Sequence, residues 1–509
     1  MAKKWLVPPS DAMFLWGETA ETMMHVASLM PFTPPPDAGP MFLRDLLQAA
    51  RKAPVMPPFN RKLSHPHMLM HPLQAWVEDE KFDIDYHVRR SALASPGDER
   101  ELGILVSRLH SHQLDFTRPP WEMHIIEGLA GGRFAIYTKV HHALVDGYSA
   151  VKLLSRSLSA DPSAEDVEFF YSLPPRSRPK PPKESASLTS MITGAAAGAA
   201  GAVTGTVTGA ADVAKAVLKL EFGRGEEQGA LKGGRDAPAT ILNQRTSRTR
   251  RFATQVYETE RLKVIARASN GTLNDVVMTI CGAALRRYLL ELGELPDKSL
   301  VAFMPVNIRE EGDEGGGNKV AVLLASMGTD VADPVQRLEA VISSTRAAKR
   351  QMKGMGQLPA LAYTGYLLAP GVAQTLAAMT GVRNPLPTTF NLVLSNVVGP
   401  RHKLYLRGAE LEAVYPISIP AHGMALNITL ETYAEKMCFG FTGDRDALPS
   451  LQRLAVFTGD ALTELEAALH LPVAGGMGED LAGTDQRRKR SSGTSKATRA
   501  ALAPRSKKG

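Results

Sequence analysis

The spacing of apolar residues predicts a strand followed by a helix in the first third of the chain. Residues 133–140 alternate in the manner of a strand, and apolar residues then recur at helical spacing from Ala150 to Leu158. The seven residues between them, HHALVDG at positions 141–147, therefore lie at a strand-to-helix junction. A strand end is a rigid place from which to aim a side chain into a cleft.

The same patterns predict further elements in the second half of the chain. A helix capped by Thr272 or Asn270 extends to about Leu290. A helix-like apolar run at residues 355–379, interrupted by two prolines, is expected to line a pocket. Two further strands and a late hairpin are predicted at residues 302–306, 392–396, 423–430 and 435–442.

Two segments of unusual composition separate these halves. Residues 172–183 contain five prolines in twelve positions, which excludes helix and inner strand. Residues 185–211 have no charge but are rich in Ala, Gly and Thr, so a segment resting on the protein or on a membrane surface is favoured over a membrane-spanning helix. The predicted organisation is an N-terminal domain, a linker, a C-terminal domain and a basic disordered tail, at residues 1–170, 171–237, 238–472 and 473–509.

The net charge of +7 comes from the tail. Residues 486–509 contain nine basic residues and no acidic ones, which leaves 50 basic against 52 acidic residues elsewhere. A nucleic-acid enzyme usually carries its positive charge on the folded domain, so nucleic acid is not expected as a partner. The tail is expected to be solvated, and the functional alternative is attraction to anionic phospholipid.

Cysteine usage and the N-terminus predict a cytoplasmic protein. Cys281 and Cys438 stand far apart in apolar surroundings, which favours buried thiols over a disulfide or a metal site. The apolar stretch near the N-terminus ends at Pro8, so it is not a secretory signal. The sequence motifs of serine hydrolases, P-loop enzymes, zinc proteases and dinucleotide-binding folds do not occur, and no metal or cofactor is expected.

The residue types of HHALVDG suit general acid–base catalysis. A neutral imidazole can take a proton from a hydroxyl near pH 7 and return it later, and His142 is the candidate base, with His141 beside it. Asp146 is expected to order the loop through an ion pair, and Gly147 leaves room for a substrate to approach. The plainer alternative is a pair of half-buried histidines beside an aspartate that caps the following helix.

The motif and several other segments together resemble one enzyme family. HHALVDG is similar to the active-site motif of the chloramphenicol acetyltransferase-like superfamily of CoA-dependent acyltransferases. Additional segments resemble the bacterial wax ester synthase/diacylglycerol acyltransferase family. They are SDAMFLW (10–16), MHVA (24–27), RPPWEMHIIEGL (118–129), LNDVVMTICGAALRRYL (273–289), MPVNIR (304–309) and NLVLSNVVGP (391–400).

The resemblance implies the fold and the activity. The fold class is α/β (α+β), with two chloramphenicol acetyltransferase-like domains facing each other across a substrate channel. The implied enzyme is an O-acyltransferase that moves a long-chain acyl group from acyl-CoA to diacylglycerol or a long-chain alcohol. Such an enzyme would associate peripherally with the inner face of the plasma membrane or with lipid bodies. The alternatives are a superfamily acyltransferase acting on a polar or carrier-bound acceptor, and a catalytically silent lipid-body protein.

The resemblance also suggests residues that contact substrate. Asn274 and Asp275 stand in the first turn of a predicted helix, where capping and substrate contact are both open roles. Asn391 and Ser395 are candidates for donating hydrogen bonds to the oxyanion. In related condensation domains an arginine pairs with the motif aspartate, and Arg61 is the candidate partner of Asp146 here.

Overall fold

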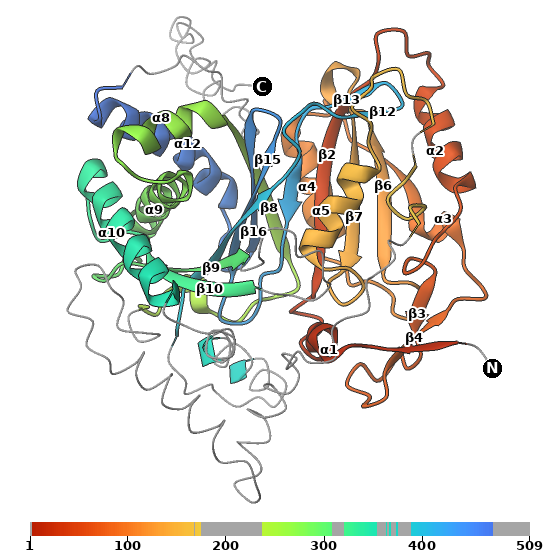
Figure 1. The fold of residues 1–509 in the computed structure, drawn as a ribbon, viewed down its shortest axis with the longest axis horizontal. Coiled ribbons are helices and arrows are strands. Elements are labelled where there is room, and N and C mark those ends of the chain that lie inside the picture. Colours follow the sequence, from red (N-terminus) through yellow and green to blue (C-terminus); the bar gives the residue numbers. More distant parts are fainter. Residues whose placement is uncertain are drawn as a thin grey trace, which may run out of the picture.

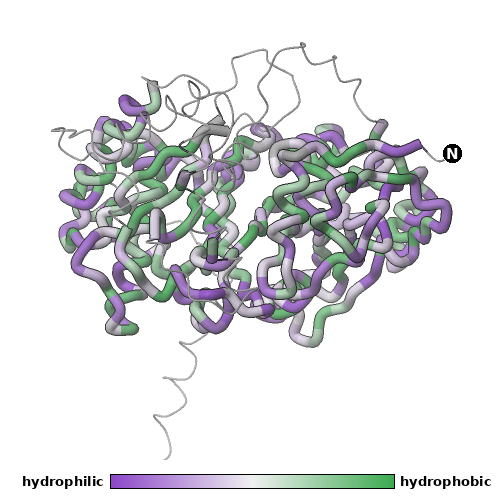
Figure 2. Tube along the Cα trace, turned by 90° about the horizontal axis from the view of Figure 1, so that it is seen from below, coloured by the Kyte–Doolittle hydropathy of each residue, from purple (hydrophilic) through white to green (hydrophobic). Residues whose placement is uncertain are grey.

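The computed structural model describes residues 3–166, 168–174, 237–307, 320–353 and 388–471, together with residues 363, 366, 367, 373 and 374. These residues form two lobes that lie side by side (Figure 1). Apolar residues gather in the interior of each lobe, between its sheet and its helices (Figure 2). The expected fold class, α/β in two facing halves, is confirmed.

The N-terminal lobe contains, in chain order, β1 (Lys4–Leu6), α1 (Pro9–Trp16), β2 (His25–Thr33), α2 (Phe42–Lys52), β3 (Arg61–Leu63), β4 (Ala75–Glu78), α3 (Ile84–His87), β5 (Val88–Ala92), α4 (Glu99–His110), β6 (Trp121–Glu127), β7 (Phe134–His141) and α5 (Gly147–Arg156). Strands β1, β4 and β3 form a small antiparallel sheet in that order. Strand β7 pairs with β2 on one side and β6 on the other, and all eight of its residues are buried.

The C-terminal half contains β8 (Arg250–Glu258), α8 (Thr259–Ala268), α9 (Leu273–Leu292), β9 (Val301–Asn307), β10 (Val320–Ser326), α10 (Pro334–Lys353), β11 (Leu392–Val398), β12 (Tyr405–Leu406), β13 (Ala409–Leu411), β14 (Tyr415–Ile417), β15 (Leu426–Tyr433), β16 (Lys436–Asp444) and α12 (Leu451–Ala468). Its six-stranded sheet has the order β10-β9-β11-β15-β16-β8. Helices α8, α9, α10 and α12 cover one face of this sheet (Figure 1).

The other face of the C-terminal sheet turns toward the N-terminal lobe. Side chains of a strand alternate between the two faces. In β15 and β16, Leu430 and Phe439 belong to the core under the helices, whereas Tyr433 and Cys438 belong to the core of the N-terminal lobe. The two lobes therefore share a buried contact through alternate residues of the same strands.

Three short strands from the C-terminal half complete the sheet of the N-terminal lobe. That sheet has the order β12-β13-β2-β7-β6-β5, and β14 also pairs with β2. Leu411 stands opposite Phe32, and Tyr415 stands opposite Leu29. Residues 405–417 thus leave the C-terminal lobe after β11 and return to it at β15 (Figure 1).

Several sequence-based expectations are confirmed. The strand predicted at residues 133–140 is β7 (Phe134–His141), and α9 starts with Thr272 as its N-cap residue, within a capping box that Asp275 completes. The late hairpin is β15 and β16, with Leu430 opposite Phe439. Both cysteines are buried and unpaired with each other.

Other expectations concern residues outside the described ranges. They are the segment 185–211, most of the apolar run 355–379, the linker from residue 175 to 236 and the tail 473–509. None of the helices in the described ranges has the length and apolar character needed to cross a membrane. The predicted domain boundaries remain predictions.

Candidate functional site

The HHALVDG motif forms the turn between strand β7 and helix α5. His141 is the last residue of β7, where it stands opposite His25 of β2. The backbone of the turn is held on both sides, since the His142 amide donates to the carbonyl of Met24 at 2.9 Å and the Leu144 amide donates to that of His141 at 2.9 Å. The position of the two histidines is therefore set by strand pairing and by the segment that precedes β2.

His142 has a neutral imidazole near pH 7. Its ring stacks on that of Phe14 from α1, with ring centroids 3.9 Å apart and planes inclined by 17°. Burial is the main cause that lowers the pKa of His142 to about 4, and the charge of Asp146 works against this shift. The Nδ1 atom is buried without a partner on another residue, and none of the described residues hydrogen-bonds Nε2. The ring can accept a proton at Nε2.

His141 is held in one tautomer. Its Nδ1 accepts a hydrogen bond from the amide of Ala143 at 3.1 Å, so the ring proton of the neutral form lies on Nε2. That Nε2 faces the carboxylate of Glu18 at 3.5 Å, and both side chains are almost completely buried. Because Nδ1 is hydrogen-bonded and Nε2 faces a buried carboxylate without forming a hydrogen bond, His141 is placed to support its neighbour rather than to exchange protons itself.

Glu18 is a residue of the site that the sequence did not suggest. Besides facing His141, its carboxylate accepts hydrogen bonds from the amide of Met24 and from Nε2 of Gln113, the latter at 3.0 Å. Met24 is the residue whose carbonyl holds the His142 amide. A single glutamate after an apolar helix has no motif of its own, so only the fold reveals that it supports both histidines.

Asp146 caps helix α5 and does not form the expected ion pair. Its carboxylate accepts hydrogen bonds from the amide and the hydroxyl of Ser149, at 2.9 and 2.8 Å. Within the described ranges no lysine or arginine forms a salt bridge with it. Arg61 lies instead over the ring of Trp5, 3.6 Å from its centroid, because β3 and β1 flank β4 in the small sheet. The prediction of an ion pair with Arg61 is corrected to a helix N-cap.

Gly147 borders open space at the start of helix α5. A Cβ atom at this position would meet no atom within 4 Å. Ala143 and Leu144 lie on the other side of the turn, packed against the apolar cluster that α1 and the small sheet form. His141, His142, Asp146 and Gly147 are thus brought together in one turn with room beside it.

The candidates in the C-terminal half are mostly engaged elsewhere. Asp275 accepts hydrogen bonds from the amide and hydroxyl of Thr272 and, at 2.6 Å, from the hydroxyl of Thr345. Its carboxylate therefore caps the N-terminus of α9 and is not free to bind substrate. Asn274 accepts a hydrogen bond from Asn396 at 2.8 Å. Asn396 lies two residues along β11 from Leu394, a member of the helix-covered core, so this contact stands on the face away from the N-terminal lobe.

Asn391 and Ser395 differ in their availability. The amide of Asn391 donates to the carbonyl of Pro238 at 2.7 Å and to Asn243 at 2.8 Å, and its oxygen accepts from Val301, so the whole side chain is used at the start of β11. Ser395 stands opposite Thr429, on the sheet face from which Tyr433 reaches the N-terminal lobe. Its hydroxyl makes no hydrogen bond to another described residue, so Ser395 remains a candidate and Asn391 does not.

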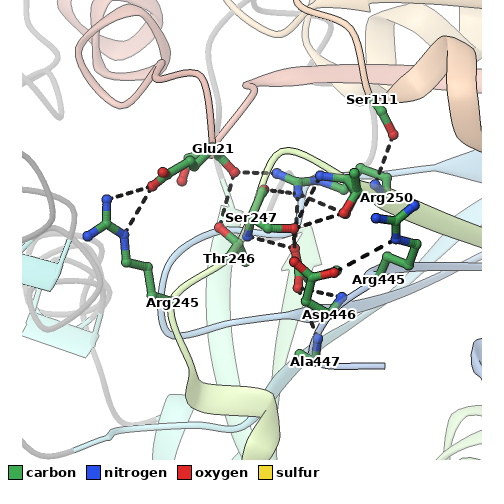
Figure 3. Close-up of polar contacts among 12 residues, drawn as sticks. Glu21, Ser111, Arg245, Thr246, Ser247, Arg250, Arg445, Asp446 and Ala447 are labelled. Carbon is green, nitrogen blue, oxygen red and sulfur yellow. Dashed lines mark hydrogen bonds and ion pairs between the residues drawn. The ribbon is translucent and has the colours of Figure 1, made fainter. Parts of the chain in front are cut away.

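A buried arginine ties the segment before β2 to the C-terminal lobe. Arg250 pairs with Asp444 at 3.4 Å and donates to the carbonyl of Glu21 (Figure 3). The hydroxyl of Thr246 donates to the same carbonyl at 3.1 Å. Burial lowers the pKa of Arg250 to about 10, which leaves it charged at neutral pH. Glu21 lies three residues after Glu18, which faces His141. The hydrogen bonds of Arg250 and Thr246 to Glu21 therefore fix the segment that positions the two histidines.

Comparisons with known proteins identify the family of the chain. Residues 7–277 match the family model of the wax ester synthase/diacylglycerol acyltransferase catalytic domain, and residues 316–466 match that of the C-terminal domain. A putative diacylglycerol O-acyltransferase of Mycobacterium tuberculosis is 53% identical over 480 residues, covering 90% of this chain and 97% of that protein.

Solved structures show the same relationship. The wax ester synthase/diacylglycerol acyltransferase of Marinobacter aquaeolei is 35% identical, with a TM-score of 0.71 over 92% of this chain and 100% of that chain. A condensation domain of the calcium-dependent antibiotic synthetase shares the fold alone, with 17% identity and a TM-score of 0.51 over 93% of this chain and 97% of its own. The chain therefore belongs to the wax ester synthase/diacylglycerol acyltransferase family.

Proposed function

We propose that this protein transfers a long-chain acyl group from acyl-CoA to the hydroxyl of diacylglycerol or of a long-chain alcohol, with His142 as general base. The observation that supports this most directly is the neutral imidazole of His142, whose Nε2 has no partner in the described structure and which stands in the same turn as the open space beside Gly147. A base must be deprotonated and able to reach a hydroxyl, and this residue meets the first condition at neutral pH. The family of the chain supports the choice of substrates.

The proposed reaction proceeds in one transfer. Nε2 of His142 takes the proton of the acceptor hydroxyl as its oxygen attacks the thioester carbonyl carbon. The carbon–sulfur bond then breaks, and the imidazolium returns the proton to the CoA thiolate. Burial raises the pKa of both Cys281 and Cys438, so neither thiol is suited to act as a nucleophile. The scheme uses acyl-CoA as co-substrate and calls on no resident cofactor.

The acceptor chemistry also suggests where the enzyme works. Diacylglycerol and long-chain alcohols are held in bilayers or lipid bodies, so the enzyme must visit a lipid surface to load them. We therefore place it in the cytoplasm, in peripheral contact with the inner face of the plasma membrane or with lipid bodies. Ser395 is retained as the candidate oxyanion donor because its hydroxyl is unengaged on the face turned toward the N-terminal lobe.

The activity can be tested by measuring release of CoA thiol from palmitoyl-CoA. The purified protein is incubated with dioleoylglycerol, with hexadecanol or with a polar alcohol, and the ester product is identified by mass spectrometry. We expect thiol release with one or both apolar acceptors, release slowed by about 10²–10⁴-fold in His142→Ala, and full release with His402→Ala, which changes an exposed histidine. Turnover with the polar alcohol alone would favour a different acyltransferase, and no turnover with any acceptor would favour a silent lipid-body protein.

A further inference from the structure

Four large apolar side chains are exposed together at the small N-terminal sheet. Met68, Met70 and Leu73, in the loop between β3 and β4, are 61%, 53% and 67% exposed. Leu6 of β1 is 69% exposed. It lies beside this loop, because the next residue, Val7, donates to the carbonyl of Gln74 at 3.0 Å (Figure 1). We call Leu6, Met68, Met70 and Leu73 the docking face.

The loop holds these side chains outward through a polar interior. The buried side chain of Gln74 donates to the carbonyls of His65 and Met68, at 2.9 and 3.2 Å, and accepts from the His65 amide at 3.0 Å. The rings of His65 and His71 stack with centroids 3.7 Å apart. Polar contacts and the inward-packed Leu69 therefore hold the loop in place, while Met68, Met70 and Leu73 stay on its outside. Clustered exposed apolar side chains of this kind mark an interaction surface.

The charge around the docking face matches an anionic surface. Residues 3–10 and 61–77 contain no aspartate or glutamate, and Lys3 and Lys4 are exposed at the start of β1. The next residue, Glu78, stands opposite Arg61 at the end of β4. Lys3 lies over the ring of Trp5, 5.4 Å from its centroid. Cations and a tryptophan beside projecting apolar side chains are the chemistry of proteins that rest in the interface of anionic phospholipid.

The docking face belongs to the same structural unit as the contacts of the proposed base. The inner side of the small sheet contributes Leu63 and Trp76 to an apolar cluster that includes Ala143 of the HHALVDG turn. Phe14, which stacks on His142, lies in the helix that directly follows β1. A lipid surface seated on the docking face would therefore contact the same packed unit that holds the turn carrying the base.

We propose that the docking face seats this protein on anionic phospholipid, so that the apolar acceptor passes from the lipid to the site through the α1 side of the N-terminal lobe. The proposal rests on the proposed function for the nature of the acceptor. It assigns lipid contact to a folded surface rather than to the basic tail alone, and this assignment can be measured separately from turnover.

The test is flotation of the full-length protein with phosphatidylcholine vesicles that contain phosphatidylglycerol, in about 1 M salt, where the screening length is only about 3 Å and the tail contributes least. The variant Met68→Ser/Met70→Ser/Leu73→Ser should bind roughly tenfold more weakly than the wild type, because it loses most of the apolar area available for insertion. The control Leu290→Ser/Leu292→Ser removes exposed apolar side chains of α9 and should bind like the wild type. Unchanged melting temperatures would show that both variants fold.

A second variant reports on insertion directly. Met70→Trp should show a blue shift of its fluorescence when vesicles are added, whereas Leu290→Trp should not. Equal vesicle binding by the wild type and the triple variant, or a change of oligomeric state in the triple variant with binding preserved, would overturn the proposal. Turnover with a short, water-soluble alcohol should be the same in both proteins. Absence of wild-type turnover with every acceptor, apolar or polar, would count against the proposed function and leave the vesicle result standing.

Discussion

Phe14 and His142 stack ring on ring, with centroids 3.9 Å apart. The contact joins helix α1 to the turn after β7, two elements more than 120 residues apart in the chain. One face of the imidazole is thereby shielded from water, and loss of hydration disfavours the charged form of a histidine. This agrees with burial as the largest cause of the low pKa of His142.

The pH dependence of turnover should reflect this burial. A general base works when deprotonated, so kcat/KM should hold a plateau above the pKa and decline as the pH falls through about 4. In Phe14→Ala the ring gains water, its pKa rises toward the ordinary value of about 6.5, and the acid limb moves to higher pH. The measurement is kcat/KM from mildly alkaline to acid pH for both proteins. Acid limbs at the same pH would show that Phe14 does not control this titration.

Replacing the base should remove most of the activity without unfolding the protein. General acid–base catalysis contributes typically about 10²–10⁴-fold, so His142→Ala should lower kcat by about that factor. Its circular dichroism and melting temperature should stay close to those of the wild type. His141→Ala is the weaker test, because it also removes the partner of Glu18. Retained turnover in a folded His142→Ala protein would rule out the mechanism.

Glu18 should influence turnover indirectly, by holding His141 and His142 in position. Glu18→Gln replaces one acceptor oxygen by a donor and removes the negative charge, which conflicts with a carboxylate that accepts from Met24 and Gln113 and faces Nε2 of His141. We expect kcat to fall by on the order of tenfold to a hundredfold, as for a small misplacement of a catalytic group, with KM for acyl-CoA little changed.

A matched control for this change stands three residues away. Glu21→Gln keeps the backbone carbonyl that binds Arg250 and changes a side chain that pairs with Arg245 and faces His422, neither of which contacts the HHALVDG turn. It should retain wild-type kcat. If Glu18→Gln also retained it, Glu18 would be a structural carboxylate without influence on the base.

Asp146 should contribute to stability as a helix cap. Asp146→Ala removes the acceptor for the amide and hydroxyl of Ser149 and should cost about 0.5–2 kcal/mol of the free energy of unfolding. Asp146→Asn keeps an acceptor oxygen, so its melting temperature should lie near that of the wild type, whereas a lost ion pair would lower it clearly. Thermal unfolding of the three proteins distinguishes these cases.

The charge of Asp146 raises the pKa of His142, so Asp146→Asn should also shift the acid limb of the kcat/KM profile to lower pH.

The basic tail should add an electrostatic component to lipid binding. Residues 486–509 contain nine basic residues and no acidic ones. Truncation after Pro472 should weaken binding to anionic vesicles at low salt, where screening is least, and leave turnover with short soluble alcohols unchanged. Co-sedimentation of the full-length and truncated proteins with anionic and neutral vesicles measures the difference. Equal binding at low salt would assign all lipid contact to the remainder of the chain.

The parts of the fold that local patterns govern were predictable from the sequence. The alternation of residues 133–140 and the cap residue Thr272 depend on neighbours a few positions away, and both elements form as expected. The HHALVDG turn follows from them, because it is the junction between a strand and a helix. The role of Asp146 was misjudged because both an ion pair and an N-cap are compatible with an aspartate at that position.

The remainder depends on contacts between distant segments. Lys139 is fully buried in β7, where its ammonium donates to the carbonyls of Leu109 and His112 and lies 3.5 Å from Glu122. A lysine in an alternating strand pattern indicates a solvated face. The three oxygen partners come from the end of α4, from the segment that follows it and from the neighbouring strand β6, which only the fold brings together. The support that Glu18 gives His141 is of the same kind, since more than 120 residues separate them.

The strands β13 and β14 have a consequence for how the protein is made. Until residues 405–417 have left the ribosome, β2 is an unprotected sheet edge that carries the buried side chains Leu29 and Phe32. Such an edge invites pairing with other chains, and pairings this distant in sequence form slowly. The sheet of the N-terminal lobe can therefore be completed only after more than 200 further residues have been synthesised. Splitting the gene between the halves should yield fragments that aggregate alone and recover a folded enzyme only when produced together.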